Sequence, residues 1–303
     1  MEKGLLKNLV GKLLFLLVLL SMALGGVLAA QTQPSAIKVY LAGDSTVKSY
    51  GTYRGEGGWG EFLQYYFKDN VTIINKAEGG RSSRSFINEG RLKDILDQIN
   101  PGDYLFVQFG HNDCAYQPAY QIERYTPLGL PDANGIYPVT PGELVTAPAG
   151  ELYKYYAFNS GGTFKWFLKQ FVDGAKAKGG IPVLVTPVSR MYYDGAVIRE
   201  HHDDDTSHGN AYVTAVKQLA AAEGVLCIDL FSITKALYER LGSDEAAKMH
   251  FVKHDGSVDQ THYNKYGAFY VGGLMAAAIK QANISISPYV QQPSKIITLE
   301  DVK

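Results

Sequence analysis

The sequence predicts an α/β protein, a three-layer α/β/α sandwich built on a five-stranded parallel sheet. Five short runs are almost wholly apolar, without the alternation of a strand that faces water on one side. Segments with the 3.6-residue period of an amphipathic helix follow several of these runs. Because strands and helices alternate along the chain, we expect a doubly wound sheet with helices on both faces.

Five ranges are the candidates for the strands of this sheet. They are 37–42, 71–74, 104–109, 181–185 and 225–228. They are interpreted as strands that are buried on both faces of a parallel sheet.

Three helices follow from the spacing of apolar residues. The first has apolar side chains at i, i+3, i+4, i+7, i+8 and i+11 from Phe164 to Ala175, and Gly179-Gly180 follows as a stop signal. A second helix is predicted over 212–220, and a third, rich in small residues, over 266–280.

The range 114–160 interrupts the pattern. It contains six prolines and many tyrosines without a lasting period. Loops of this length inside a compact domain are functional or disordered, and the tyrosine content favours an ordered insertion that lines a site. We therefore predict one domain over 31–303 with an insertion at 114–160.

The first thirty residues have the features of a secretory signal peptide. Three lysines precede an apolar run from Leu13 to about Leu24, and the segment ends in Ala29-Ala30. The run is short for a bilayer span of about 20 residues, although an uncleaved anchor is the alternative. We expect a secreted or periplasmic protein that has no stable membrane association after cleavage.

The net charge argues against nucleic-acid binding, and the cysteine content argues against a fold held by disulfides. The formal net charge of −1 gives no basic surface of the kind that nucleic-acid binding requires. Cys114 and Cys227 are too few for a disulfide framework. Cys227 lies in an apolar run, so we expect a buried thiol there, with a disulfide between the two as the alternative.

Unusual polar motifs follow the predicted strands at the edge where open α/β sheets bind ligands. They are Gly43-Asp44-Ser45-Thr46, Gly79-Gly80-Arg81-Ser82, Gly110-His111-Asn112-Asp113 and, before the last helix, Asp259-Gln260-Thr261-His262. Taken singly, each also fits an ordinary turn, a helix cap or a solvated loop.

In combination, these motifs contain every group that acyl transfer needs. Ser45 is the candidate nucleophile, His262 the base that takes its proton, and Asp259 the carboxylate that orients the imidazole. The Gly80 N–H, the Asn112 side-chain amide and the N–H of Ser45 itself are candidate donors to an oxyanion.

The same motifs resemble the signature blocks of the SGNH/GDSL hydrolases, a family with a flavodoxin-like sheet. The variants Gly-Asp-Ser-Thr at 43–46 and Gly-Arg-Ser at 80–82, with Gly58-Trp59-Gly60-Glu61 and Phe109 to Asp113, are similar to rhamnogalacturonan acetylesterases. The resemblance implies the same catalytic and oxyanion assignments. It also implies a serine esterase that removes O-acetyl groups from a plant cell-wall polysaccharide or oligosaccharide, most specifically pectin.

Other functions stay open at this point. Another SGNH activity, such as acetylxylan esterase, lipase or thioesterase, is the alternative within enzymes. A carbohydrate-binding protein without catalysis is the alternative outside them.

Two further features concern ligands. Arg81 is suited either to the carboxylate of an acidic sugar or to a carboxylate of the protein. The run 201–205 has metal-ligating residue types but is more typical of a solvated loop. Ester hydrolysis by a serine nucleophile needs no metal ion and no cofactor, so we expect the protein to have neither.

Overall fold

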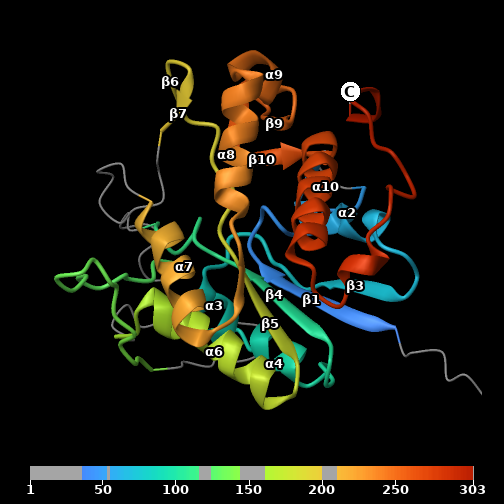
Figure 1. Cartoon of the computed structure of the whole chain (residues 1–303). Coiled ribbons are helices and arrows are strands. Elements are labelled where there is room, and N and C mark those ends of the chain that lie inside the picture. The colour runs from blue at the N-terminus through green and yellow to red at the C-terminus, as the bar shows by residue number, and fades with distance from the viewer. Residues whose placement is uncertain (1–35, 53–54, 116–123, 144–160, 200–209, 303) are drawn as a thin grey trace, which may run out of the picture. The chain divides into compact units, whose positions relative to one another are not determined.

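The centre of the computed structural model is a parallel sheet of five strands in the order β3-β1-β4-β5-β8. The structure describes residues 36–52, 55–115, 124–143, 161–199 and 210–302. The strands are β1 (Ile37–Gly43), β3 (Val71–Asn75), β4 (Tyr104–Gln108), β5 (Ile181–Val185) and β8 (Leu226–Ile228). All five predicted strands are confirmed. Figure 1 shows them crossing the molecule between two layers of helices.

Alternate side chains of β1 enter two different apolar cores. Val39 and Leu41 lie in one core, whereas Tyr40 and Ala42 lie in the other, and all four are at most 1 % exposed. Successive residues of a strand point to opposite faces of its sheet, so both faces of β1 are buried. This burial explains the almost wholly apolar sequence from Val39 to Ala42.

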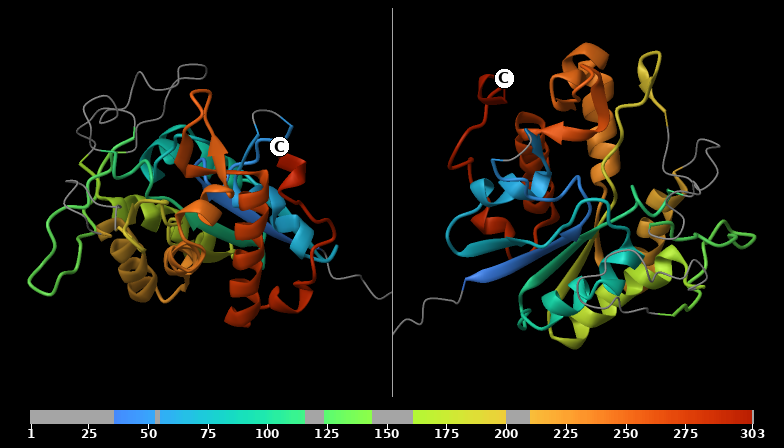
Figure 2. Two further views of the ribbon diagram at one scale, coloured as in Figure 1. Left: turned by 90° about the horizontal axis from the view of Figure 1, so that it is seen from above. Right: turned by 180° about the vertical axis from the view of Figure 1, so that it is seen from behind.

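Helices from different parts of the chain cover the two faces. One layer consists of α3 (Ser83–Asn88), α4 (Arg91–Leu96), α6 (Phe164–Ala177) and α7 (Ala211–Glu223). The other layer consists of α2 (Trp59–Phe62), the 3-10 helix η1 (Leu63–Tyr66), α8 (Leu230–Leu241) and α10 (Lys265–Ala282). The view from behind shows the sheet between these layers (Figure 2). The three predicted helices correspond to α6, α7 and α10.

The apolar period of α6 matches the face that it buries. Its buried positions include Phe164, Phe167, Leu168 and Phe171, which pack in the same core as Tyr40 and Ala42. After the helix, Gly179 has a φ of 73°, the left-handed conformation that glycine adopts without steric cost. The chain then turns directly into β5.

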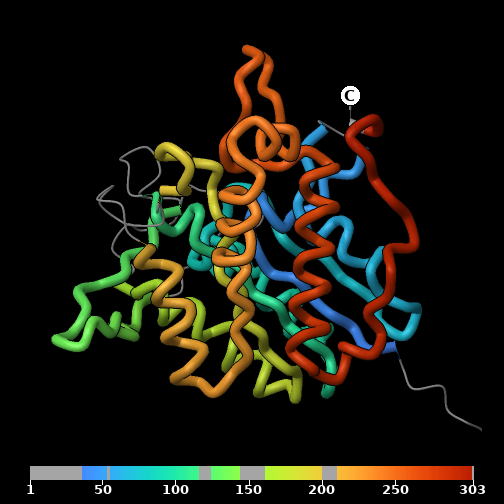
Figure 3. The backbone as a smooth tube through the Cα atoms, turned by 45° about the horizontal axis from the view of Figure 1, so that its top comes forward, coloured from blue at the N-terminus to red at the C-terminus, as the bar shows by residue number. Residues whose placement is uncertain are grey.

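A second, antiparallel sheet was not predicted. It has the order β2-β10-β9 and comprises β2 (Glu56–Gly57), β9 (His250–Val252) and β10 (Val258–Asn264). Asp259 and His262 are both residues of β10. The tube in Figure 3 shows the hairpin between β9 and β10 projecting from the rest of the unit.

The remaining elements are short. They are α9 (Ser243–Ala247), the hairpin of β6 (Tyr193–Asp194) and β7 (Val197–Ile198), η2 (Ser287–Tyr289) and η3 (Glu300–Val302). The segment after α10 runs back to η1, where Phe67 and Val290 form an isolated β-bridge.

Several expectations fall outside the described residues. They are the signal peptide at 1–30, the parts 116–123 and 144–160 of the insertion, and the run 201–205. In the ranges that the structure describes, no helix is long and apolar enough to cross a membrane. Both cysteines are free thiols, so the alternative of a disulfide between them is not seen.

Candidate active site

Ser45 lies in a tight turn that begins where β1 ends. The N–H groups of Val47 and Lys48 both donate to the carbonyl of Asp44, at 3.2 and 3.1 Å. Gly43 is needed at the entry, because a β-carbon there would lie 2.6 Å from the side chain of Val47. The turn therefore presents Ser45 at the carboxyl edge of the sheet, as the sequence predicts.

A fully buried carboxylate stabilises this turn. Asp44 Oδ1 accepts hydrogen bonds from the Thr46 N–H and hydroxyl, at 2.9 and 2.8 Å. Its Oδ2 lies 3.2 Å from Nδ1 of His111. Burial acts to raise the pKa of Asp44, but His111 and Thr46 outweigh it and lower that pKa. Asp44 thus joins the Ser45 turn to the motif that follows β4.

His262 on β10 reaches Ser45 across 217 residues of sequence. Its Nε2 lies 3.0 Å from Ser45 Oγ, and its Nδ1 lies 3.2 Å from Asp259 Oδ1. The same Asp259 oxygen accepts the N–H groups of Thr261 and His262, at 2.7 and 2.8 Å. Burial acts to raise the pKa of Asp259, yet these hydrogen bonds and the imidazole hold it well below the usual range. The carboxylate is therefore ionised and holds the imidazole in place.

Arg190, which follows β5, connects the two motifs around the imidazole. Its guanidinium donates to the carbonyl of His111 at 3.1 Å and to the hydroxyl of Thr261, the neighbour of His262. Beneath β10, His250 Nε2 lies 2.9 Å from the Tyr238 hydroxyl, which lies 3.1 Å from that of Tyr263. The Arg190 contacts thus link β10 to the loop after β4, and the contacts of Tyr238 link β9 and β10 to α8.

The glycine pair that carries one of the predicted oxyanion donors lies next to Ser45. A β-carbon on Gly79 would be 3.7 Å from the β-carbon of Ser45, so the glycine pair borders the nucleophile. Neither the Ser45 N–H nor the Gly80 N–H has an acceptor among the residues that the structure describes. Asn112 donates one hydrogen of its amide to the Arg81 carbonyl at 3.0 Å, which leaves its second hydrogen for another acceptor.

Arg124, in the insertion, is a site residue that the sequence analysis missed. Its guanidinium would lie 3.3 Å from a β-carbon on Gly80, so it borders the oxyanion donors. Gly80 has a φ of 75°, which also disfavours any other residue there. An arginine in an aperiodic loop has no sequence signal that would single it out.

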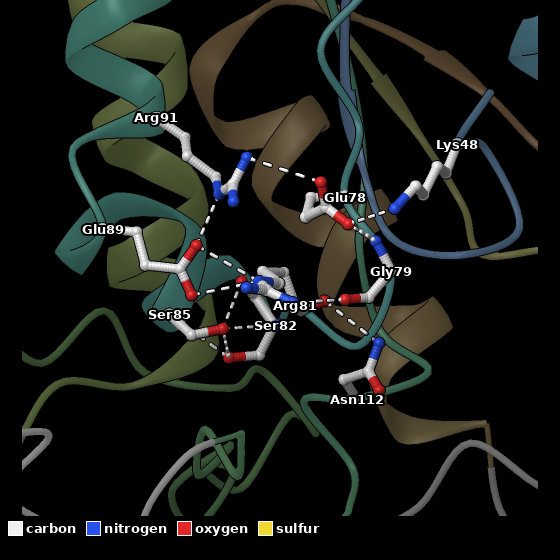
Figure 4. A network of polar contacts seen from close by, with 9 residues as sticks. All are labelled: Lys48, Glu78, Gly79, Arg81, Ser82, Ser85, Glu89, Arg91 and Asn112. Atoms are coloured by element: carbon white, nitrogen blue, oxygen red, sulfur yellow. Dashed lines mark hydrogen bonds and ion pairs between the residues drawn. The ribbon is translucent and has the colours of Figure 1, made fainter. Parts of the chain in front are cut away.

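Arg81 pairs with a carboxylate of the protein, the second of its two predicted alternatives. Its Nε lies 3.0 and 3.1 Å from the two carboxylate oxygens of Glu89, and its Nη1 donates to the Gly79 carbonyl at 2.7 Å. Figure 4 shows the guanidinium between these partners, with Glu78, Lys48 and Arg91 forming ion pairs beside it. The Arg81 side chain is only 10 % exposed.

Asp113 is buried behind the Asn112 motif. Its Oδ1 accepts hydrogen bonds from the N–H and the hydroxyl of Ser83, at 2.9 and 2.5 Å. Burial outweighs these bonds and raises the pKa of Asp113 to about 7. This carboxyl ties the start of α3 to the end of β4, and with it the two loops that carry Gly80 and Asn112.

The described part of the chain has no cluster of metal-ligating side chains. It contains no group of three or more histidine, cysteine, aspartate or glutamate residues that could hold a metal ion. The run 201–205 lies outside that part.

The arrangement has the geometry of a nucleophile with its base. The imidazole can accept the Ser45 proton at Nε2 while Asp259 stabilises the positive charge that forms. Two main-chain N–H groups and one side-chain amide are available on the neighbouring loops for a developing oxyanion.

Comparison with known sequences agrees with this geometry. Residues 41–268 match the GDSL-like lipase/acylhydrolase family. The chain is 37 % identical over 249 residues to YesY of Bacillus subtilis, described as a "probable rhamnogalacturonan acetylesterase", covering 82 % of this chain and 95 % of YesY. It is 34 % identical over 263 residues to the rhamnogalacturonan acetylesterase RhgT of Bacillus subtilis, covering 84 % and 94 % of the two chains.

Comparison with solved structures agrees as well. The crystal structure of YxiM from Bacillus subtilis has a TM-score of 0.60 and a sequence identity of 25 %. The match covers 82 % of this chain and 58 % of that one, a little over half of its length. The fold of this chain is thus shared with that solved structure.

Proposed function

The chain belongs to the GDSL-like lipase/acylhydrolase family, and on this premise we propose that it is a serine esterase that removes O-acetyl groups from rhamnogalacturonan. The observation that carries the proposal is the chain of contacts from Ser45 Oγ through the His262 imidazole to Asp259. The names of the two relatives support the choice of polymer.

The first half of the proposed reaction transfers the acetyl group to the enzyme. Ser45 Oγ attacks the acetyl carbonyl carbon while its proton moves to Nε2 of His262. The carbonyl oxygen becomes an oxyanion that accepts hydrogen bonds from Gly80, Asn112 and the Ser45 N–H. The intermediate then collapses, the bond to the sugar oxygen breaks, and His262 gives its proton to that oxygen. The products are acetyl-Ser45 and a free sugar hydroxyl.

The second half returns the enzyme to its starting state. His262 takes a proton from a water molecule, whose oxygen attacks the acetyl carbon of acetyl-Ser45. The same three donors stabilise the second oxyanion. When the ester bond breaks, His262 returns the proton to Ser45 Oγ, and acetic acid leaves.

Arg124 is our candidate for recognition of the polymer. Rhamnogalacturonan contains galacturonate, and a guanidinium is well suited to a sugar carboxylate. Arg124 borders Gly80, so a carboxylate on the sugar next to the reacting acetyl group can reach it. Arg81 is not assigned this role, because its guanidinium is buried against Glu89.

Acetate release tests the proposal. Wild-type protein and the Ser45→Ala variant are incubated with acetylated rhamnogalacturonan and, in parallel, with acetylated xylan. We expect release from the pectin polymer by the wild type only. Release from xylan alone would keep the mechanism and overturn the substrate, whereas activity retained in Ser45→Ala would overturn the nucleophile.

We also propose that the protein is exported and cleaved after about residue 30. The support is the order of lysines, apolar run and small residues within 1–30. Sequencing the N-terminus of protein recovered from the medium or the periplasm would test this. Intact Met1 on a cell-associated protein would contradict it.

A further inference from the structure

The peptide between Gly79 and Gly80 is held from the side opposite to its N–H. Arg81 Nη1 donates to the Gly79 carbonyl at 2.7 Å, and this carbonyl belongs to the same peptide unit as the Gly80 N–H. In a trans peptide the C=O and the N–H point in opposite directions. A guanidinium that fixes the carbonyl therefore fixes the direction of the N–H as well.

A hydrogen bond from the Arg81 N–H to the Glu78 carbonyl at 3.4 Å closes the turn around this peptide, but such a bond does not fix the direction of the central peptide. Both of its residues are glycines, which lack the β-carbon that restricts φ and ψ elsewhere in the chain. Rotation of the peptide plane would turn the Gly79 carbonyl oxygen toward the position of the oxyanion, where its partial negative charge would be repulsive. A charge-assisted hydrogen bond from Arg81 opposes this rotation.

The second oxyanion donor depends on the same residue. Asn112 Nδ2 donates to the main-chain carbonyl of Arg81 at 3.0 Å, which sets the plane of the Asn112 amide. In Figure 4 the Arg81 side chain reaches Gly79 while its carbonyl meets Asn112. Two donors from different loops are thus oriented by two groups of one residue.

Glu89, at the end of α3, holds the guanidinium in this position. Both oxygens of its carboxylate accept a hydrogen bond from the Nε–H of Arg81. The Glu89 side chain is 3 % exposed and the Arg81 side chain 10 %. Arg91 also pairs with Glu89, but no contact of Arg91 with Gly79 is found in the structure. Arg91 therefore shares the carboxylate without contacting the peptide.

We propose that Arg81 is a positioning residue that orients the two oxyanion donors Gly80 and Asn112, and that Glu89 fixes the Arg81 guanidinium for this purpose. The inference rests on the proposed function, because it needs an oxyanion to form at Ser45. Arg81 acts through the peptide and the amide and does not itself contact the reacting atoms.

The test compares Arg81→Ala with wild type in the hydrolysis of 4-nitrophenyl acetate. We expect kcat to fall about 10- to 100-fold while KM changes less than about threefold, since the donors act mainly on the transition state. The Ki of methylboronic acid, which forms a tetrahedral adduct with the serine hydroxyl, should rise by a similar factor. Arg91→Ala is the matched control, and its kcat and Ki should stay within about threefold of wild type.

Each other result has a defined meaning. Wild-type kcat in folded Arg81→Ala, or a fall in kcat with an unchanged boronate Ki, would overturn the inference. If Arg81→Ala does not fold, Glu89→Gln replaces it, and wild-type kcat in that folded variant would also overturn the inference. Absence of Ser45-dependent ester cleavage in the wild type would instead overturn the proposed function.

Discussion

Replacement of Asn112 by alanine should lower kcat much more than it lowers the free energy of unfolding. One hydrogen of Nδ2 is used by the Arg81 carbonyl at 3.0 Å, and the second is the one that we assign to the oxyanion. The Asn112→Ala variant loses both interactions at once. Its two effects should differ in size, because one is a bond in the resting protein and the other exists only in the transition state.

The expected magnitudes follow from these two interactions. Loss of one oxyanion donor lowers kcat about 100- to 1000-fold, equivalent to about 3–4 kcal/mol of transition-state stabilisation. Loss of one neutral hydrogen bond lowers the free energy of unfolding by about 1 kcal/mol. For a domain of this size, that change lowers Tm by about 2–4 °C.

The assay measures kcat for 4-nitrophenyl acetate well below the Tm of each variant. Gln64→Ala is a control at the opposite edge of the sheet, since Gln64 Nε2 also donates to a main-chain carbonyl, that of Val71, at 3.1 Å. We expect this control to lose stability but to keep kcat within about threefold. If folded Asn112→Ala also kept kcat within about threefold, the assignment of Asn112 as an oxyanion donor would be wrong.

Three more predictions concern protonation and substrate. The rate should fall as pH decreases, because a protonated His262 cannot accept the Ser45 proton; a profile that is flat down to about pH 4 would contradict this role. Burial raises the pKa of Asp113 to about 7, above the pKa of an aspartate in an unfolded chain. Between these two pKa values the folded protein keeps a proton that the unfolded chain has lost, so the free energy of unfolding should fall by about 2 kcal/mol as pH rises from about 5 to about 7. Asp113→Asn should lack this contribution in urea unfolding at the two pH values, and an equal pH dependence in both proteins would argue against it. Arg124→Gln should raise KM for acetylated rhamnogalacturonan about tenfold while leaving 4-nitrophenyl acetate hydrolysis within about threefold, and equal effects on both substrates would exclude recognition of a sugar carboxylate.

The central sheet was predictable because its strands are buried on both faces. Their apolar side chains are set by local composition, so the five ranges could be located without knowledge of the fold. The place of Ser45, Gly80 and Asn112 could be predicted because the strands before them are parallel, which brings the three residues to one edge of the sheet.

The second sheet could not be predicted by this route. β10 is largely polar, and of its seven residues only Thr261 and Tyr263 are buried. It becomes a strand by pairing with β9 and β2, which have three and two residues. Such short strands have no period to detect, so no strand was predicted around Asp259 and His262.

The sequence could not predict which carboxylate Arg81 binds. An arginine next to a glycine pair is equally suited to a substrate carboxylate and to Glu89, eight residues later. Only the positions of Glu89 and Gly79 in space distinguish the two.

The distance of 217 residues between Ser45 and His262 has a consequence for biosynthesis. A ribosome makes the nucleophile early and the base near the end of the chain, and a domain generally folds as a unit. A nascent chain that lacks β10 contains Ser45, Gly80 and Asn112 but lacks His262, the residue that accepts the serine proton. Translation of residues 258–303 therefore completes the proposed esterase, and a chain that ends before β10 would be inactive even if its central sheet had formed.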